Sequence, residues 1–102
     1  MRLSLQQRNA ICENAKINFG EFSHVWLFGS RVDDKKAGGD IDLYIEPQEK
    51  DPATLVNAKL YFLMSLHRQL GDQKIDVVIK PFSTLNNEAI YNIARETGVQ
   101  LL

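Results

Sequence analysis

Apolar residues near the N-terminus recur every three to four positions, which is the period of an α-helix. Ser4-x-x-Gln7 is a capping-box pattern, so a helix is expected to begin there, and Gly20 is expected to end it. Similar spacing over residues 88–97, followed by Gly98, predicts another helix near the C-terminus. The first helix should bury an apolar face made of Leu5, Cys12, Ala15 and Phe19.

A longer helix is predicted in the middle of the chain. Asp51 can cap its first turn, Pro52 suits the first helical position, and Gly71 ends the pattern. Its buried stripe is expected to consist of Leu55, Val56, Leu60, Leu63, Leu66 and Leu70.

Three segments have the patterns of β-strands. Residues 25–28 form a short continuous apolar run, which is typical of a strand buried on both faces. Residues 74–80 alternate between apolar and polar positions. Residues 40–46 alternate strictly, which predicts one apolar and one polar face. The polar face should carry Asp40, Asp42, Tyr44 and Glu46.

These elements predict an α/β (α+β) fold in which a small mixed sheet of three to four strands packs with three main helices. The 102 residues, 44% of them apolar, fit one globular domain spanning residues 1–102. A formal net charge of -1 gives no general attraction to nucleic acid. The single cysteine, Cys12, indicates a reducing compartment. Because no apolar run approaches the roughly 18 residues that span a bilayer, and no signal-peptide pattern is present, a cytoplasmic location is expected.

Two carboxylates lie close together on the strictly alternating strand. Because strand residues advance by about 3.3 Å, Asp40 and Asp42 should hold their carboxylates within roughly 7 Å of each other. Such a pair repels unless a cation neutralises it, and Mg²⁺ prefers carboxylate oxygens together with substrate phosphates. If Asp76 shares that face, three carboxylates could hold two metal ions about 3.5–4 Å apart, as in nucleotidyl transfer. These three aspartates are therefore the candidate metal ligands and catalytic residues.

The end of the apolar strand is a candidate phosphate-binding turn. Gly29 lets the backbone approach an anion, and Ser30 offers a hydroxyl and a backbone N–H. Arg31 could add a charge-assisted hydrogen bond to a triphosphate. A Walker A loop, a dinucleotide-binding glycine motif and an EF-hand are excluded, because the sequence lacks glycines at the positions that they require.

The combination of Gly29-Ser30, Asp40-x-Asp42 and the later strand residue Asp76 resembles the polymerase β-type nucleotidyltransferase superfamily. More narrowly, nearly the whole chain is similar to a minimal nucleotidyltransferase, a stand-alone catalytic domain usually encoded beside a small helical HEPN-domain protein. The resemblance implies that Gly29 and Ser30 bind the nucleotide triphosphate. It also implies that Asp40, Asp42 and Asp76 are the carboxylates that hold the metal.

The same resemblance implies a Mg²⁺-dependent enzyme that uses ATP as its substrate. It would transfer AMP to a hydroxyl, expected to be that of a tyrosine, on a cognate HEPN-type toxin and so act as an antitoxin. The expected partner is that toxin, in a hetero-oligomer, and neither direct DNA or RNA binding nor a membrane is expected. Two alternatives stay open: a non-catalytic nucleotide-binding antitoxin that neutralises the toxin by contact, and a nucleotidyltransferase that acts on a small molecule.

Overall fold

Three helices and four strands make up the part of the chain that the computed structural model describes, residues 1–33, 39–80 and 88–102. In those residues, no helix has both the length and the apolar character needed to cross a membrane. In chain order the elements are α1 (Leu5–Phe19), β1 (His24–Phe28), the 3₁₀ turn η1 (Gly29–Val32), β2 (Ile41–Glu46), α2 (Pro52–Leu70), β3 (Ile75–Ile79), α3 (Glu88–Thr97) and β4 (Val99–Gln100).

The four strands form one mixed sheet in the order β3-β2-β1-β4, which confirms the predicted fold class. β1 is antiparallel to both β2 and β4, whereas β2 and β3 are parallel. Helix α2 connects the two parallel strands, since parallel neighbours need a long crossover rather than a tight turn. The register pairs Asp42 with Phe28 on one side and with Asp76 on the other.

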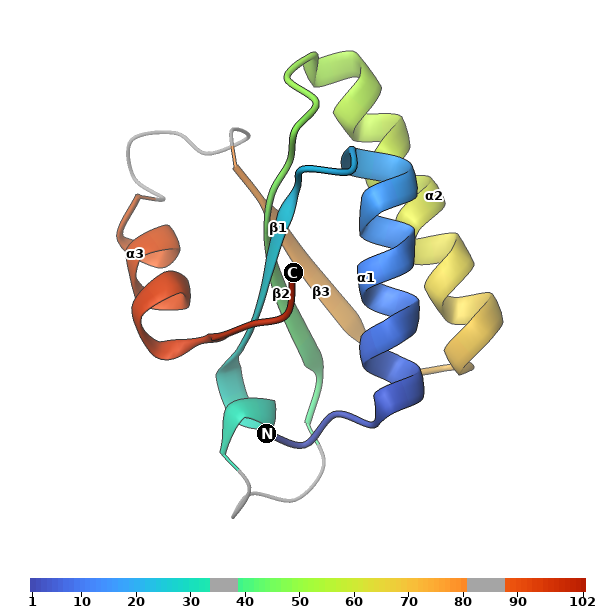
Figure 1. The fold of residues 1–102 in the computed structure, drawn as a ribbon. Helices are drawn as coiled ribbons and strands as arrows, with labels where there is room; N and C mark the ends of the chain where they lie inside the picture. Colours follow the sequence, from blue (N-terminus) through green and yellow to red (C-terminus); the bar gives the residue numbers. More distant parts are fainter. Residues whose placement is uncertain (34–38, 81–87) are drawn as a thin grey trace.

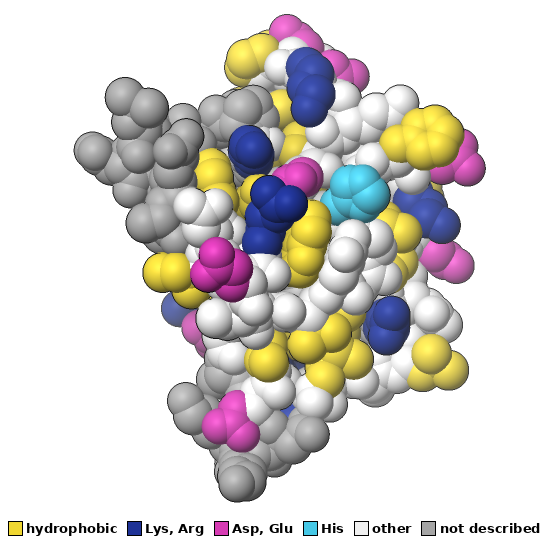
Figure 2. Space-filling model, turned by 60° about the vertical axis from the view of Figure 1, so that its left-hand side comes forward, with side chains coloured by type: hydrophobic (Ala, Val, Ile, Leu, Met, Phe, Trp, Pro, Cys, Tyr) yellow, Lys and Arg dark blue, Asp and Glu magenta, His cyan; other side chains and the backbone are white. Residues whose placement is uncertain are grey.

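Helices cover both faces of this sheet (Figure 1). Helices α1 and α2 lie side by side on one face, and α3 lies on the other. Under α1 and α2, the rings of Phe19 and Phe62 meet edge to face with centroids 5.2 Å apart. The space-filling view toward the α3 side shows charges of both signs scattered among apolar side chains (Figure 2). The smaller core under α3 contains Trp26, Tyr44, Tyr91 and Ala94.

The helix ends follow the sequence signals. The side chain of Ser4 accepts a hydrogen bond from the backbone N–H of Gln7 at 3.0 Å, and Gln7 Oε1 accepts one from the backbone N–H of Ser4 at 2.9 Å. The Asp51 carboxylate accepts from the backbone N–H of Thr54 at 3.0 Å and so caps α2. The predicted starts of α1 and α2, and their ends before glycine, are therefore confirmed.

The predicted buried faces of these two helices are partly wrong. Leu5 is 74% exposed, Val56 60% and Leu60 55%. Helix α2 carries apolar residues in two rows, and only one row can face the sheet, so Val56 and Leu60 remain on the outside. The buried residues are Ala10, Ile11, Asn14, Ala15 and Phe19 in α1 and Leu55, Ala58, Phe62 and Leu66 in α2.

The predicted polar face of β2 also needs a correction at Tyr44. This side chain is fully buried, because α3 covers that part of the sheet and the Tyr91 ring stacks on it with centroids 5.2 Å apart. The Tyr44 hydroxyl donates a hydrogen bond to Glu46 Oε2 at 2.7 Å. Burial, followed by the bond to Glu46, raises the pKa of Tyr44 well above its ordinary value. The polar alternation of β2 is therefore interrupted by a buried, hydrogen-bonded tyrosine.

Candidate metal and nucleotide site

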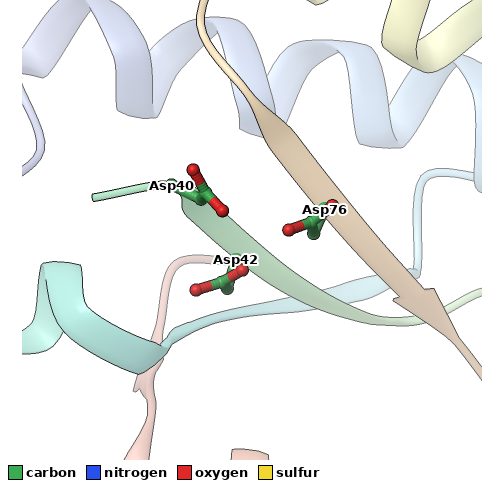
Figure 3. Close-up of side chains that lie close together, drawn as sticks. All are labelled: Asp40, Asp42 and Asp76. Atoms are coloured by element: carbon green, nitrogen blue, oxygen red, sulfur yellow. The ribbon is translucent and has the colours of Figure 1, made fainter.

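Three carboxylates converge where β2 and β3 begin (Figure 3). Asp40 directly precedes β2, and Asp42 and Asp76 are the second residues of β2 and β3. Each contributes a carboxylate oxygen to a cluster in which these atoms all lie within 4.8 Å of one another. The structure therefore brings together the three acidic residues that the sequence indicates as metal ligands.

The parallel register brings Asp76 into this cluster. Asp42 and Asp76 are Cα partners across the β2–β3 pair, so their side chains lie side by side on the same face. Asp40 joins them because side chains two residues apart point to the same side of a strand. The alternation of β3 is visible in the sequence, whereas its register with β2 is a property of the folded sheet.

The clustering makes ionisation of Asp42 costly. Partial burial raises the pKa of Asp42 above its ordinary value, and the nearby charges of Asp76 and Asp40 raise it further. The positive charge of Lys74 lowers the pKa of Asp42, but by less than these effects raise it. Its Nζ lies 3.5 Å from Asp40 Oδ2, but these side chains are 71% and 41% exposed, so the ion pair stabilises the fold only slightly. A divalent cation would offset the repulsion among the carboxylates far more than this lysine does.

The donor set suits a hard divalent cation. Carboxylate oxygens are the protein ligands that Mg²⁺ prefers, and two ligands on opposite sides of Mg²⁺ lie about 4.2 Å apart, since each bond is about 2.1 Å long. Oxygens within 4.8 Å of one another can reach such positions by small side-chain rotations. Asp76 is exposed, so an ion or a substrate phosphate can approach the cluster from solvent.

Gly29 lies against the cluster at the start of η1. Its φ is +78°, and a Cβ at this position would overlap a carboxylate oxygen of Asp42. The left-handed backbone therefore favours glycine here, and a larger residue would push the Asp42 carboxylate from its present position. Ser30 also lies in η1, but its side chain is outside the described part of the structure. The predicted phosphate-binding turn thus lies directly beside a predicted metal ligand.

Comparison of the chain with models of known protein families gives no match. No curated protein matches it either. The chemistry of the site is therefore inferred from its side chains: accessible carboxylates beside a glycine turn can bind a divalent cation together with a phosphate-bearing ligand.

Arg31, predicted to bind the nucleotide, is bonded to the backbone of its own chain. Its Nε donates a hydrogen bond to the Gly39 carbonyl at 3.3 Å, and its Nη1 donates one to the Arg2 carbonyl at 3.0 Å. Its contact with a triphosphate stays a prediction.

Lys74 and Arg2 are basic residues near the site that the sequence did not single out. Lys74 precedes Asp76 by two residues on an alternating segment, so the period of two could have placed both on one face. Arg2 has no comparable signal, because its bonds with η1 join segments far apart in the chain.

Proposed function

We propose that this chain is a Mg²⁺-dependent nucleotidyltransferase that transfers AMP from ATP to a hydroxyl on a protein partner. The observation that supports it best is the cluster of Asp40, Asp42 and Asp76, with a carboxylate oxygen of each within 4.8 Å of the others. Exposed acidic clusters also occur without a metal, so the proposal needs a second observation beside the carboxylates. That observation is Gly29, whose backbone lies against Asp42 in a glycine turn that lets the chain approach an anion closely.

In this proposal the three carboxylates hold Mg²⁺, which supplies charge neutralisation and favours the ionised form of the attacking hydroxyl. The acceptor oxygen forms a bond to the α-phosphorus of ATP, and the bond from that phosphorus to the pyrophosphate oxygen breaks. The hydroxyl proton passes to a nearby carboxylate or to water, and pyrophosphate leaves. Asp76 is the candidate proton acceptor, because it is exposed whereas Asp40 and Asp42 are partly buried.

The proposed acceptor is a tyrosine of a helical HEPN-type toxin, which the product would inactivate. The sequence resemblance supports this acceptor, and the accessibility of Asp76 is compatible with it, since a protein hydroxyl must reach the cluster from outside. ATP as the donor and the toxin as the partner both belong to the proposal.

The test uses ATP labelled on its α-phosphate, Mg²⁺ and the product of the neighbouring gene. Label is expected on that protein, and Asp42→Asn should reduce transfer by at least about 100-fold, because it weakens a ligand whose metal stabilises the transition state by several kcal/mol. Asp72→Asn is the matched control, since it removes an exposed carboxylate close in sequence to Asp76 but outside the cluster. Absence of label, or equal transfer by Asp42→Asn, would contradict the proposal.

The remaining outcomes distinguish the alternatives. Binding of Mg-ATP without transfer, together with toxin inhibition by Asp42→Asn, would favour a non-catalytic antitoxin that acts by contact. Labelling of a small hydroxylated compound in place of the protein would favour a small-molecule nucleotidyltransferase.

A further inference from the structure

The guanidinium of Arg31 joins three segments beside the carboxylate cluster. It extends from η1, and its Nε and Nη1 donate to the carbonyls of Gly39 and Arg2. Because both bonds use N–H groups of one rigid plane, they fix the orientation of the guanidinium relative to both carbonyls. Arg31 therefore joins η1 to Gly39, the residue that precedes Asp40.

The N-terminal segment also donates hydrogen bonds to η1 and to the residue after it. The backbone N–H of Arg2 donates to the Arg31 carbonyl at 2.7 Å, and Arg2 Nε donates to the Asp33 carbonyl at 3.1 Å. Residues 2 and 31 thus form one hydrogen bond in each direction. The bond from Arg2 Nε holds Asp33, the residue directly after η1. Because Arg2 precedes the first residue of α1, these bonds join the start of the chain to η1.

Asp40 depends on this arrangement because it lies just outside β2. On its C-terminal side, the backbone N–H of Ile41 donates to the Lys74 carbonyl at 3.0 Å, which attaches the strand to the chain leading into β3. On its N-terminal side, Arg31 holds the carbonyl of Gly39. Both neighbours of Asp40 are thereby anchored, and its carboxylate is presented to Asp42 and Asp76.

We infer that Arg31 is a positioning residue of the metal site, which holds Asp40 in place through Gly39 while the backbone of Arg2 anchors the guanidinium. This inference rests on the proposed metal site and replaces direct contact with the triphosphate as the main role of Arg31. It makes a specific demand: loss of the Arg31 side chain must weaken metal binding even when no nucleotide is present. A residue that only contacts phosphate would leave metal binding unchanged under that condition.

The experiment is calorimetric titration with Mn²⁺ alone, without nucleotide, of the wild type and of Arg31→Ala, Arg31→Lys and Arg2→Ala. Removing a group that orients a metal ligand typically weakens affinity by about 10-fold or more, and that loss is expected for Arg31→Ala. Arg2→Ala should lose much less affinity, because both bonds between residues 2 and 31 use the backbone of Arg2 and remain in the variant. Arg31→Lys should not retain the wild-type affinity, because a lysine keeps the charge but lacks the planar N–H groups that fix both carbonyls in one orientation. Arg68→Ala is the control for net charge, since Arg68 is exposed on α2.

The outcomes separate this inference from the proposed function. If the wild type binds Mn²⁺ and Arg31→Ala binds it equally well, the positioning role is wrong while the metal site stands. If Arg31→Lys binds like the wild type, charge rather than geometry is responsible, which also contradicts the inference. If neither the wild type nor the Arg68→Ala control binds Mn²⁺, the inference and the proposed metal site fail together. Thermal unfolding of each variant confirms that it is folded before titration.

Discussion

Replacing Gly29 with alanine tests whether the turn and the carboxylate cluster form one site. Gly29 has φ +78°, and an added Cβ would overlap a carboxylate oxygen of Asp42 and lie 3.2 Å from its Cγ. A non-glycine residue in the left-handed region costs about 1–2 kcal/mol, and Asp42 must also turn away from the added methyl group. Gly71→Ala is the matched control, because Gly71 has φ +83° but nothing within 4 Å of its added Cβ.

Both variants should lose stability, but only Gly29→Ala should lose metal affinity. A loss of about 1 kcal/mol lowers the melting temperature by roughly 4–8 °C in a domain near this size. With Mg²⁺ at ten times the dissociation constant of the wild type, binding should stabilise the wild type and Gly71→Ala by about 1.4 kcal/mol. A tenfold weaker Gly29→Ala should gain only about 0.4 kcal/mol.

Thermal unfolding with Mg²⁺ and with EDTA measures both effects in one experiment. The expected result is a drop in melting temperature for both variants in EDTA and a smaller response to Mg²⁺ for Gly29→Ala. An equal response to Mg²⁺ in all three proteins would refute the reasoning, because it would mean that Asp42 can turn away from Gly29 without leaving the metal.

Three further substitutions test the electrostatics of the site and the two cores. In metal-free buffer, Asp42→Asn should unfold at a higher temperature than the wild type near neutral pH. The pKa of Asp42 is raised in the folded protein, so the contribution of Asp42 to stability is full below the unfolded pKa of 3.8 and is lost as pH rises through the folded pKa. Melting in EDTA across that range should therefore show the difference in melting temperature between Asp42→Asn and the wild type widening with pH. Phe62→Ala should lower the free energy of unfolding by about 3–5 kcal/mol in a urea titration, whereas Tyr61→Ala should change it by no more than about 0.5 kcal/mol; similar losses would contradict the assignment of the buried face. Tyr44→Phe should cost about 0.5–1.5 kcal/mol, because it removes the hydrogen bond to Glu46 while Arg95 stays paired with that carboxylate, and Mn²⁺ titration should show unchanged affinity.

The helices and strands could be predicted because their ends depend on local chemistry. The capping box at Ser4, the cap at Asp51 and the glycines after both helices act within a few residues, so the sequence contains the whole signal. The buried faces could not be predicted to the same extent. Both rows of apolar residues on α2 have helical spacing, and only packing against the sheet decides that Phe62 is buried while Leu60 is exposed.

The candidate site divides in the same way. Asp40 and Asp42 share a face by strand alternation alone, so their proximity follows from the sequence. The approach of Asp76 depends on which strand pairs with β2, in which direction and in which register. The position of Arg2 depends on where α1 begins relative to η1. Neither arrangement leaves a local pattern in the chain.

The core fixes the register on which the site depends. β3 buries Ile75, Val77 and Ile79 on the face opposite Asp76, and the pair with β2 continues beyond the strand through the bond from Lys80 N–H to the Ile45 carbonyl at 3.1 Å. A slip of β3 by one residue would turn those three aliphatic side chains away from the core, at about 1.5–3 kcal/mol for each. The same slip would move Asp76 to the other face of the sheet. The carboxylate cluster is therefore held together against its own repulsion by the hydrophobic burial of β3, and it can lose Asp76 only when that burial is lost as well.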